Sequence, residues 1–129
     1  MSERFLPEHR VKRTADFARA YQRRASVADE RLIVFASPNG LEHPRLGLSV
    51  SRKVGGAVVR NRWKRLIREA FRLSFSALPA GCDLVVIPRA AEIPSLRAIQ
   101  TSLVALAGRA ARKSSRIQDD GQGPGRPLR

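Results

Sequence analysis

The sequence predicts an α+β fold, an α/β sandwich in which helices pack on a mostly antiparallel sheet. Patterns of helical period alternate along the chain with short stretches rich in β-branched residues, and Pro and Gly turns separate them. The length of 129 residues suits one domain built around one core. The expected order of elements is therefore α-β-β-α-β-α.

The first helix is expected to begin at Thr14, which is a suitable N-cap. Apolar side chains follow it at helical spacing, namely Phe17, Ala18 and Tyr21. The pattern therefore predicts a helix that lays one apolar face on the rest of the fold.

Two strands are expected next. Residues 31–37 read RLIVFAS and end at a Pro-Asn-Gly turn, and residues 45–51 read RLGLSVS, in which apolar and small residues alternate. The small side of the second strand carries Gly47, Ser49 and Ser51. Because turn residues lie between the two strands, they are predicted to form an antiparallel hairpin with a long loop.

The stretch VVRNRWKRLIREAFR begins at Val58 and lies within a helix expected over residues 57–76. At about 100° per residue, one side carries Val59, Trp63, Leu66, Ile67, Ala70 and Leu73, with Phe71 at its edge. The other side carries Arg60, Asn61, Lys64, Arg65, Arg68 and Arg72. Trp63 is thus expected to anchor the helix in the core rather than to stack on a base.

A third strand is expected in CDLVVIPR, which starts at Cys82, and a last helix is expected from Ser95 to about Arg112. The sequence KSSRIQDDGQGPGRPLR follows from Lys113 and has few apolar residues. The predicted organisation is one domain over residues 1–113 and a disordered basic tail over residues 114–129.

Charge is the unusual property of the chain, with 25 Lys and Arg against 11 Asp and Glu, or a net +14. A polyanion is the expected partner, with nucleic acid favoured over an anionic membrane surface. There is no apolar run long enough for a membrane span and no signal-peptide pattern, so a cytoplasmic protein without membrane association is expected.

The residues that usually carry chemistry are sparse. Cys82 is the only cysteine and is expected in the core, and His9 and His43 lie near prolines and are expected in solvated loops. The 11 carboxylates are scattered, which argues against a self-contained metal site or a catalytic residue. Any catalysis is therefore expected to belong to the partner.

The basic helix differs from an ordinary solvated helix. Its cations are mostly Arg, which can grip phosphate with two parallel hydrogen bonds, and carboxylates at i,i+4 are nearly absent. The preceding SRKVGG places two more cations and flexible backbone near the helix N-terminus, where anions are favoured. These features raise the expectation of polyanion binding.

The segment RLGLSVSRKVGGAVVRNRWKRLIREAFR closely resembles the signature of the protein subunit of bacterial ribonuclease P. LPEHRVKRTADFARAY is similar to the N-terminal region of that family, and GCDLVVIPR and the last helix fit their places. The resemblance covers about residues 5–112. It implies one further short strand and a left-handed β-α-β crossover through the basic helix, where general rules favour a right-handed one.

The resemblance also implies a function. Members of the family bind a catalytic RNA and help it remove the 5′ leader of precursor tRNA, so both RNAs are expected partners and no protein partner is required. The active site and most Mg²⁺ ligands are expected in the RNA subunit and the substrate.

Two surfaces follow from the resemblance. The catalytic RNA is expected to bind Arg60, Asn61, Arg62, Lys64, Arg65 and Arg68, with Arg62 pointing away from the main basic side. A cleft for the single-stranded leader is expected to be lined by Phe17, Tyr21, Phe35, Ser49, Ser51, Lys53 and Arg89. Phe17 and Phe35 also have an alternative interpretation as ordinary core residues.

Two other functions fit the charge and the size. A structural RNA-binding protein of ribosomal type would remain with ribosomes in high salt. A DNA-binding protein would insert the basic helix in the major groove, although no second helix is placed as in a helix-turn-helix.

Overall fold

The computed structural model describes residues 6–90 and 92–121. Its helices and strands are α1 (Thr14–Arg23), β1 (Ser26–Ala28), β2 (Leu32–Pro38), β3 (Arg45–Leu48), α2 (Ala57–Leu73), β4 (Cys82–Pro88) and α3 (Leu96–Gly121). The predicted α+β class and element order are confirmed, and β1 is the further short strand. Single turns of 3-10 helix lie at Pro7–His9, Arg52–Val54 and Phe75–Ala77.

The four strands are ordered β1-β2-β4-β3. β2 pairs antiparallel with β1 and with β4, whereas β3 runs parallel to β4. The predicted hairpin of the segments now identified as β2 and β3 was therefore wrong, because β4 lies between them. β4 is buried on both faces from Asp83 to Val86, which suits a central strand.

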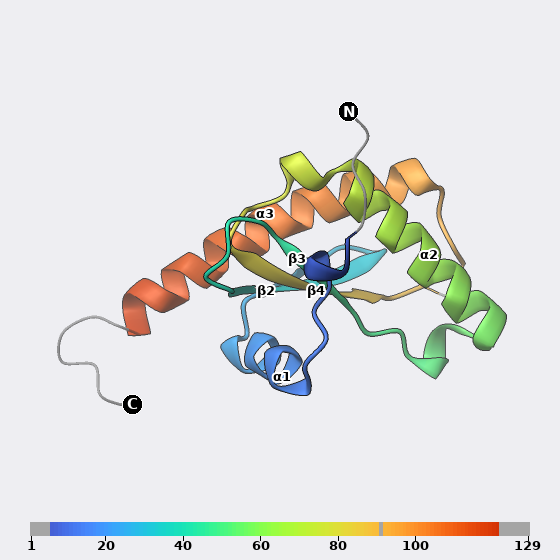
Figure 1. Cartoon of the computed structure of the whole chain (residues 1–129). Helices are drawn as coiled ribbons and strands as arrows, with labels where there is room; N and C mark the ends of the chain where they lie inside the picture. The colour runs from blue at the N-terminus through green and yellow to red at the C-terminus, as the bar shows by residue number, and fades with distance from the viewer. Residues whose placement is uncertain (1–5, 91, 122–129) are drawn as a thin grey trace.

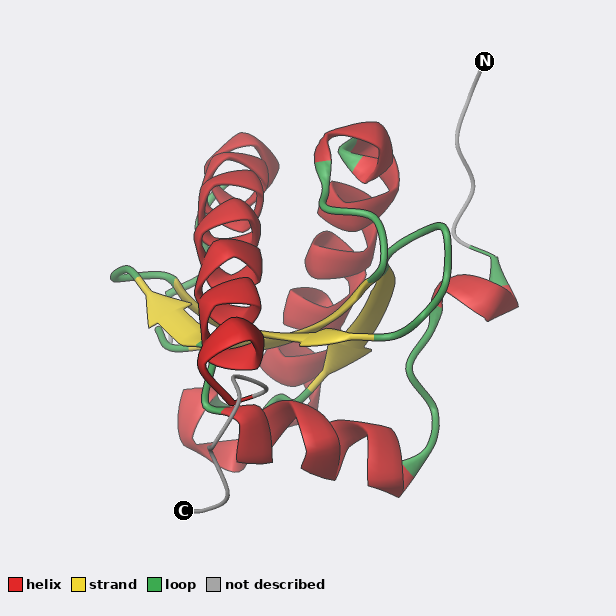
Figure 2. Ribbon diagram, turned by 90° about the vertical axis from the view of Figure 1, so that its left-hand side faces the viewer, coloured by secondary structure: helices red, strands yellow, loops and turns green. Residues whose placement is uncertain are grey.

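Helices cover both faces of the sheet. α2 and α3 lie side by side on one face and α1 crosses the other (Figure 1; Figure 2). The main core fills the space between the sheet and the α2–α3 pair, with Leu32, Val34, Trp63, Ile67 and Leu103 all fully buried. Burying these apolar side chains is the main favourable term in folding, at about 25 cal/mol per Å².

The last helix is longer than predicted. α3 continues to Gly121, so the expected disorder from residue 114 was wrong for its first eight residues. Polar contacts hold this extension, because Arg23 Nε donates to Ser114 Oγ (2.7 Å) and Lys113 Nζ donates to Ser26 O (3.0 Å). The predicted tail over 122–129 lies outside the described residues.

Three local predictions were also wrong. Leu73 is 43% exposed because α2 ends there, and Phe71 is fully buried in its place. β3 ends at Leu48, so Ser49 and Ser51 follow the strand rather than belong to it. His9 is 7% exposed rather than solvated, since its ring packs on Phe75 with centroids 4.4 Å apart.

Candidate nucleic-acid interface

α2 holds its basic face rigidly. Trp63, Ile67 and Ala70 are fully buried on its inner side, which confirms the predicted core role of Trp63. The Trp63 indole N–H also donates to Ala90 O at 3.1 Å, so the helix is tied to the loop after β4. With its inner side fixed in this way, α2 presents the outer side chains in a defined array.

The predicted RNA-subunit contacts all lie on α2, outside the core. Asn61, Arg62 and Arg65 are exposed, and Arg60, Lys64 and Arg68 are half-buried. All six residues therefore project from one helix. The aliphatic stems of Arg60, Lys64 and Arg68 pack on the protein.

Few carboxylates lie near the cations on the basic face of α2. Arg72 is paired with Glu69, and that hydrogen bond lowers the pKa of the Glu69 carboxyl below its ordinary value. Among the described residues, no carboxylate lies within ion-pair distance of the other five cations, which are Arg60, Arg62, Lys64, Arg65 and Arg68. The face can therefore attract and bind phosphates without first breaking internal ion pairs.

The SRKVGG segment folds back before α2. Ser51 Oγ accepts from Lys53 N (2.9 Å) and caps the turn Arg52–Val54. Gly55 then takes φ 146°, and a Cβ there would lie 2.8 Å from Val59 Cβ, so glycine is required. The turn places Ser51 and Lys53 beside a hollow on the sheet.

This hollow has a volume of about 570 Å³. It is lined by Ile33, Ser51, Lys53, Val54, Ile87, Pro88 and Arg89. Arg89 is held at its rim because its Nη1 donates to Asp29 O at 2.7 Å. Three of the predicted leader contacts, Ser51, Lys53 and Arg89, are thus brought together.

The predicted aromatic residues form the neighbouring part of the same face. Ile33 and Phe35 alternate with inward residues on β2, so both point toward α1. The ring of Phe35 meets that of Tyr21 edge to face, with centroids 5.0 Å apart, and Tyr21 remains 36% exposed. The face therefore continues from the Tyr21–Phe35 pair to the hollow.

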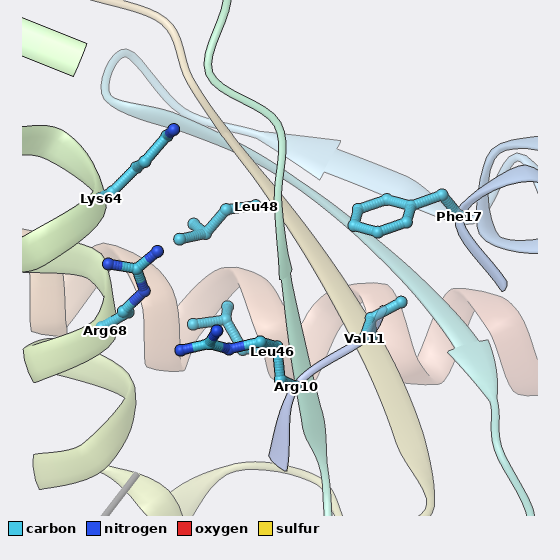
Figure 3. A pocket seen from close by; sticks show the side chains of 7 residues that line it. All are labelled: Arg10, Val11, Phe17, Leu46, Leu48, Lys64 and Arg68. Atoms are coloured by element: carbon cyan, nitrogen blue, oxygen red, sulfur yellow. The ribbon is translucent and has the colours of Figure 1, made fainter. Parts of the chain in front are cut away.

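Phe17 occupies a different position. A Cβ on Gly47 would lie 2.9 Å from Phe17 Cε1, so the ring is seated on the backbone of β3. At Gly47, Phe17 therefore fills the space over the small side of β3, and its ring lines the pocket shown in Figure 3. Ser49 is half-buried, and its N–H donates to Val86 O at 3.2 Å.

Polar contacts fix both ends of α1, and the sequence reading missed them. Arg45 binds the buried carboxylate of Asp83 through Nε (2.7 Å) and Nη2 (2.6 Å), and its Nη2 also lies 3.4 Å from Asp16 Oδ2. The hydrogen bond to Asp83 raises the pKa of Arg45 above its ordinary value. At the other end of α1, Arg23 binds Ser114. The helix that carries Phe17 and Tyr21 is thereby held against the sheet.

Neither a cluster of metal ligands nor a membrane-spanning helix is found among the described residues. Within the described ranges 6–90 and 92–121, no three His, Cys, Asp or Glu side chains gather as a metal-binding group. In the same part of the chain, every helix falls short of the length and apolarity needed to cross a bilayer.

Comparison with known proteins gives one consistent family. The family model described as ribonuclease P matches residues 5–111. The ribonuclease P protein component of Brevibacillus brevis is 44% identical over 104 residues, which cover 79% of this chain and 82% of that protein. The component of Staphylococcus aureus is 44% identical over 98 residues, which cover 74% and 84%.

Solved structures of the same family have the same fold. The ribonuclease P protein of Thermotoga maritima superposes with a TM-score of 0.71 at 34% identity and covers 78% of this chain and 96% of its own. A structure of the Staphylococcus aureus protein gives a TM-score of 0.69 at 39% identity and covers 79% and 94%.

Proposed function

This chain belongs to the ribonuclease P protein family, and we propose that it binds the catalytic RNA through α2 and the 5′ leader of precursor tRNA through the face under α1. As a ribonuclease P protein component it is part of an endoribonuclease that processes tRNA. The two binding roles, and a cytoplasmic site of action, go beyond the family assignment and form the proposal.

The basic face of α2 is the observation that carries the first role. Five of its cations have no carboxylate partner among the described residues, while Trp63, Ile67 and Ala70 on the opposite side of the helix are fully buried. Arg side chains held in fixed positions suit the phosphates of a folded RNA, whose backbone is presented with a defined shape.

The face under α1 supports the second role. A partly exposed Tyr21 beside Phe35 offers a surface for unpaired bases, and stacking on such a ring is worth roughly 1–3 kcal/mol per base. Lys53 and Arg89 at the neighbouring hollow supply charge for the leader backbone. An aromatic surface beside cations is the combination that single-stranded nucleic acid requires.

The protein and the RNA subunit then have different roles. We assign bond cleavage, and the Mg²⁺ ions that it needs, to the RNA subunit and the substrate. The protein residues on both faces bind and position RNA, which leaves the Mg²⁺ chemistry to the larger partner.

Reconstitution with the cognate ribonuclease P RNA tests this function. The complex should cleave precursor tRNA at a lower Mg²⁺ concentration than the RNA alone, and the protein alone should not cleave. A matched control is the variant Arg65→Glu, which should lose stimulation while keeping its fold. If wild-type protein gave no stimulation at low Mg²⁺, the proposal would be wrong.

A further inference from the structure

The turn between β1 and β2 is built around the side chain of Asp29. Asp29 N donates to Leu32 O at 3.0 Å, which closes a turn whose central residues are Glu30 and Arg31. The carboxylate folds back over this turn, because Asp29 Oδ1 accepts from Arg31 N (2.8 Å) and from Leu32 N (2.9 Å). Asp shapes turns in this way by accepting from the backbone that follows it. The path of the chain between the two strands therefore depends on the Asp29 carboxylate.

This arrangement leaves a backbone carbonyl for another donor. In many β-turns the carbonyl of the first residue accepts from the N–H of the fourth, which here would join Asp29 O to Leu32 N. Leu32 N donates to the Asp29 carboxylate instead. The Asp29 carbonyl accepts from Arg89 Nη1 at 2.7 Å. The turn thus binds a cation that follows β4 at the place where an internal hydrogen bond is usual.

Arg89 is held through both its backbone and its side chain. Its N–H donates to Arg31 O at 2.9 Å, so its backbone continues the pairing of β2 with β4 beyond the strand ends. Its side chain is exposed, and without a partner it would sample many rotamers. The bond to Asp29 O restricts it and keeps the guanidinium at the rim of the hollow that Lys53 also lines. A guanidinium has several N–H donors, so others remain for a phosphate.

The turn is also anchored to α3. Arg31 Nη1 donates to Ser102 Oγ at 3.0 Å, and Ser102 is only 2% exposed. The Ser102 hydroxyl in turn hydrogen-bonds the Asp29 carboxyl. Because the turn is tied to a buried residue of a long helix, the carbonyl that accepts from Arg89 has a fixed place.

We propose that Asp29 is a positioning residue for leader binding, which holds the Arg89 guanidinium where a phosphate of the leader arrives. The inference rests on the proposed function and adds to it an acidic residue that acts without contacting RNA. Charge alone predicts the opposite effect, because a carboxylate near the hollow repels a phosphate. Positioning outweighs this repulsion, since a cation that is already ordered loses less conformational entropy on binding.

The test compares Asp29→Ala with Glu30→Ala in the complex reconstituted with the catalytic RNA. Each variant removes a carboxylate from the same turn, but only the first frees Leu32 N to take the carbonyl of residue 29 from Arg89. Asp29→Ala should lower the ratio of precursor to mature tRNA affinity about fivefold, part of the roughly tenfold loss expected for Arg89→Ala. Glu30→Ala should keep or raise this ratio. Asp29→Asn retains the acceptor Oδ1 and should keep the ratio even though it is less stable.

A double variant separates positioning from an independent role. Adding Asp29→Ala to Arg89→Ala should cause no further loss, because a positioning residue acts through the residue that it positions. Equal ratios for Asp29→Ala and Glu30→Ala, a wild-type ratio for Arg89→Ala, or losses that add in the double variant would each overturn the proposal.

Two further variants keep the test decisive. If Asp29→Ala does not fold, Asp29→Ser takes its place, and its hydroxyl, which forms such turns more weakly, should give a smaller loss in the same direction. Tyr21→Ala, measured in parallel, reveals whether the face under α1 binds the leader, so the positioning role and the proposed function fail separately.

Discussion

The rings of Tyr21 and Phe35 meet edge to face at 5.0 Å, with their planes at 87°. They join α1 to β2 and leave Tyr21 partly open, so one ring supports the other for stacking. Tyr21→Ala should weaken binding of precursor tRNA about tenfold and leave mature tRNA binding unchanged. The measurement is equilibrium binding of both tRNAs to the reconstituted complex. Tyr21→Phe keeps the ring and should behave as wild type, whereas equal losses for both tRNAs would count against stacking.

Trp63 supports the basic face from inside. Its side chain is fully buried and donates to Ala90 O. Trp63→Phe should lower the free energy of unfolding by about 1–2 kcal/mol, because the carbonyl of the half-buried Ala90 loses its donor. Trp63→Ala should cost about 3–5 kcal/mol. Urea unfolding measures both, with the exposed neighbour Arg62→Ala as control. A Trp63→Phe variant of wild-type stability would show that the hydrogen bond contributes nothing.

Ser114 lies beyond the family match at residues 5–111, yet it is 3% exposed and bound to Arg23. Ser114→Ala should lower the free energy of unfolding by about 1 kcal/mol, since the Arg23 side chain loses an acceptor. The adjacent Ser115 is exposed, so Ser115→Ala should have no effect in the same urea titration. Equal stability of the two variants would mean that the hydrogen bond from Arg23 to Ser114 Oγ does not contribute to holding α1.

Asp29 makes stability depend on pH. Burial raises the pKa of its carboxyl, but hydrogen bonds from Ser102, Leu32 and Arg31 outweigh this, and the net pKa lies below the ordinary 3.8. A lowered pKa means that the stabilisation is present above pH 3.8 and is lost as the pH falls through the folded value. Asp29→Asn should thus be less stable than wild type near neutral pH.

The test is urea unfolding of wild type and Asp29→Asn from about pH 6 downward. The difference in unfolding free energy should shrink below pH 3.8. A difference that stays constant with pH would contradict the assigned cause. The control is Glu42→Gln, because this carboxylate is exposed to solvent.

Sequence patterns predicted the features that depend on local periodicity. The two sides of α2 follow from 3.6 residues per turn, and the structure places Trp63 and Arg65 accordingly. The residue pattern predicted the wrong partner for β3, because strand partners are set by tertiary packing, which turn residues near Asn39 do not encode. Only the family resemblance implied a β-α-β crossover through α2. β1 has three residues, too few for a pattern.

For the candidate site, too, the sequence predicted individual residues but not the contacts between residues distant in the chain. The aromatic and basic residues were predicted from the family resemblance, and the structure brings Lys53 and Arg89 to one hollow. The contacts of Arg45 with Asp83 and Asp16 join residues up to 38 positions apart and leave no local signal. Asp83 within an apolar strand was the one available hint, because a buried carboxylate requires a partner.

The central claim is that α2 binds the catalytic RNA by charge. Its most direct test is the salt dependence of that binding for wild type and for the double variant Arg65→Glu/Arg68→Glu. Fewer released counterions should lower the slope by roughly 1.4 to 1.8 and weaken affinity at every salt concentration. Arg109→Glu/Arg112→Glu, which reverses two exposed cations on α3, is the matched control and should change the slope little. Equal slopes for wild type and the α2 variant, with the fold intact, would contradict the claim.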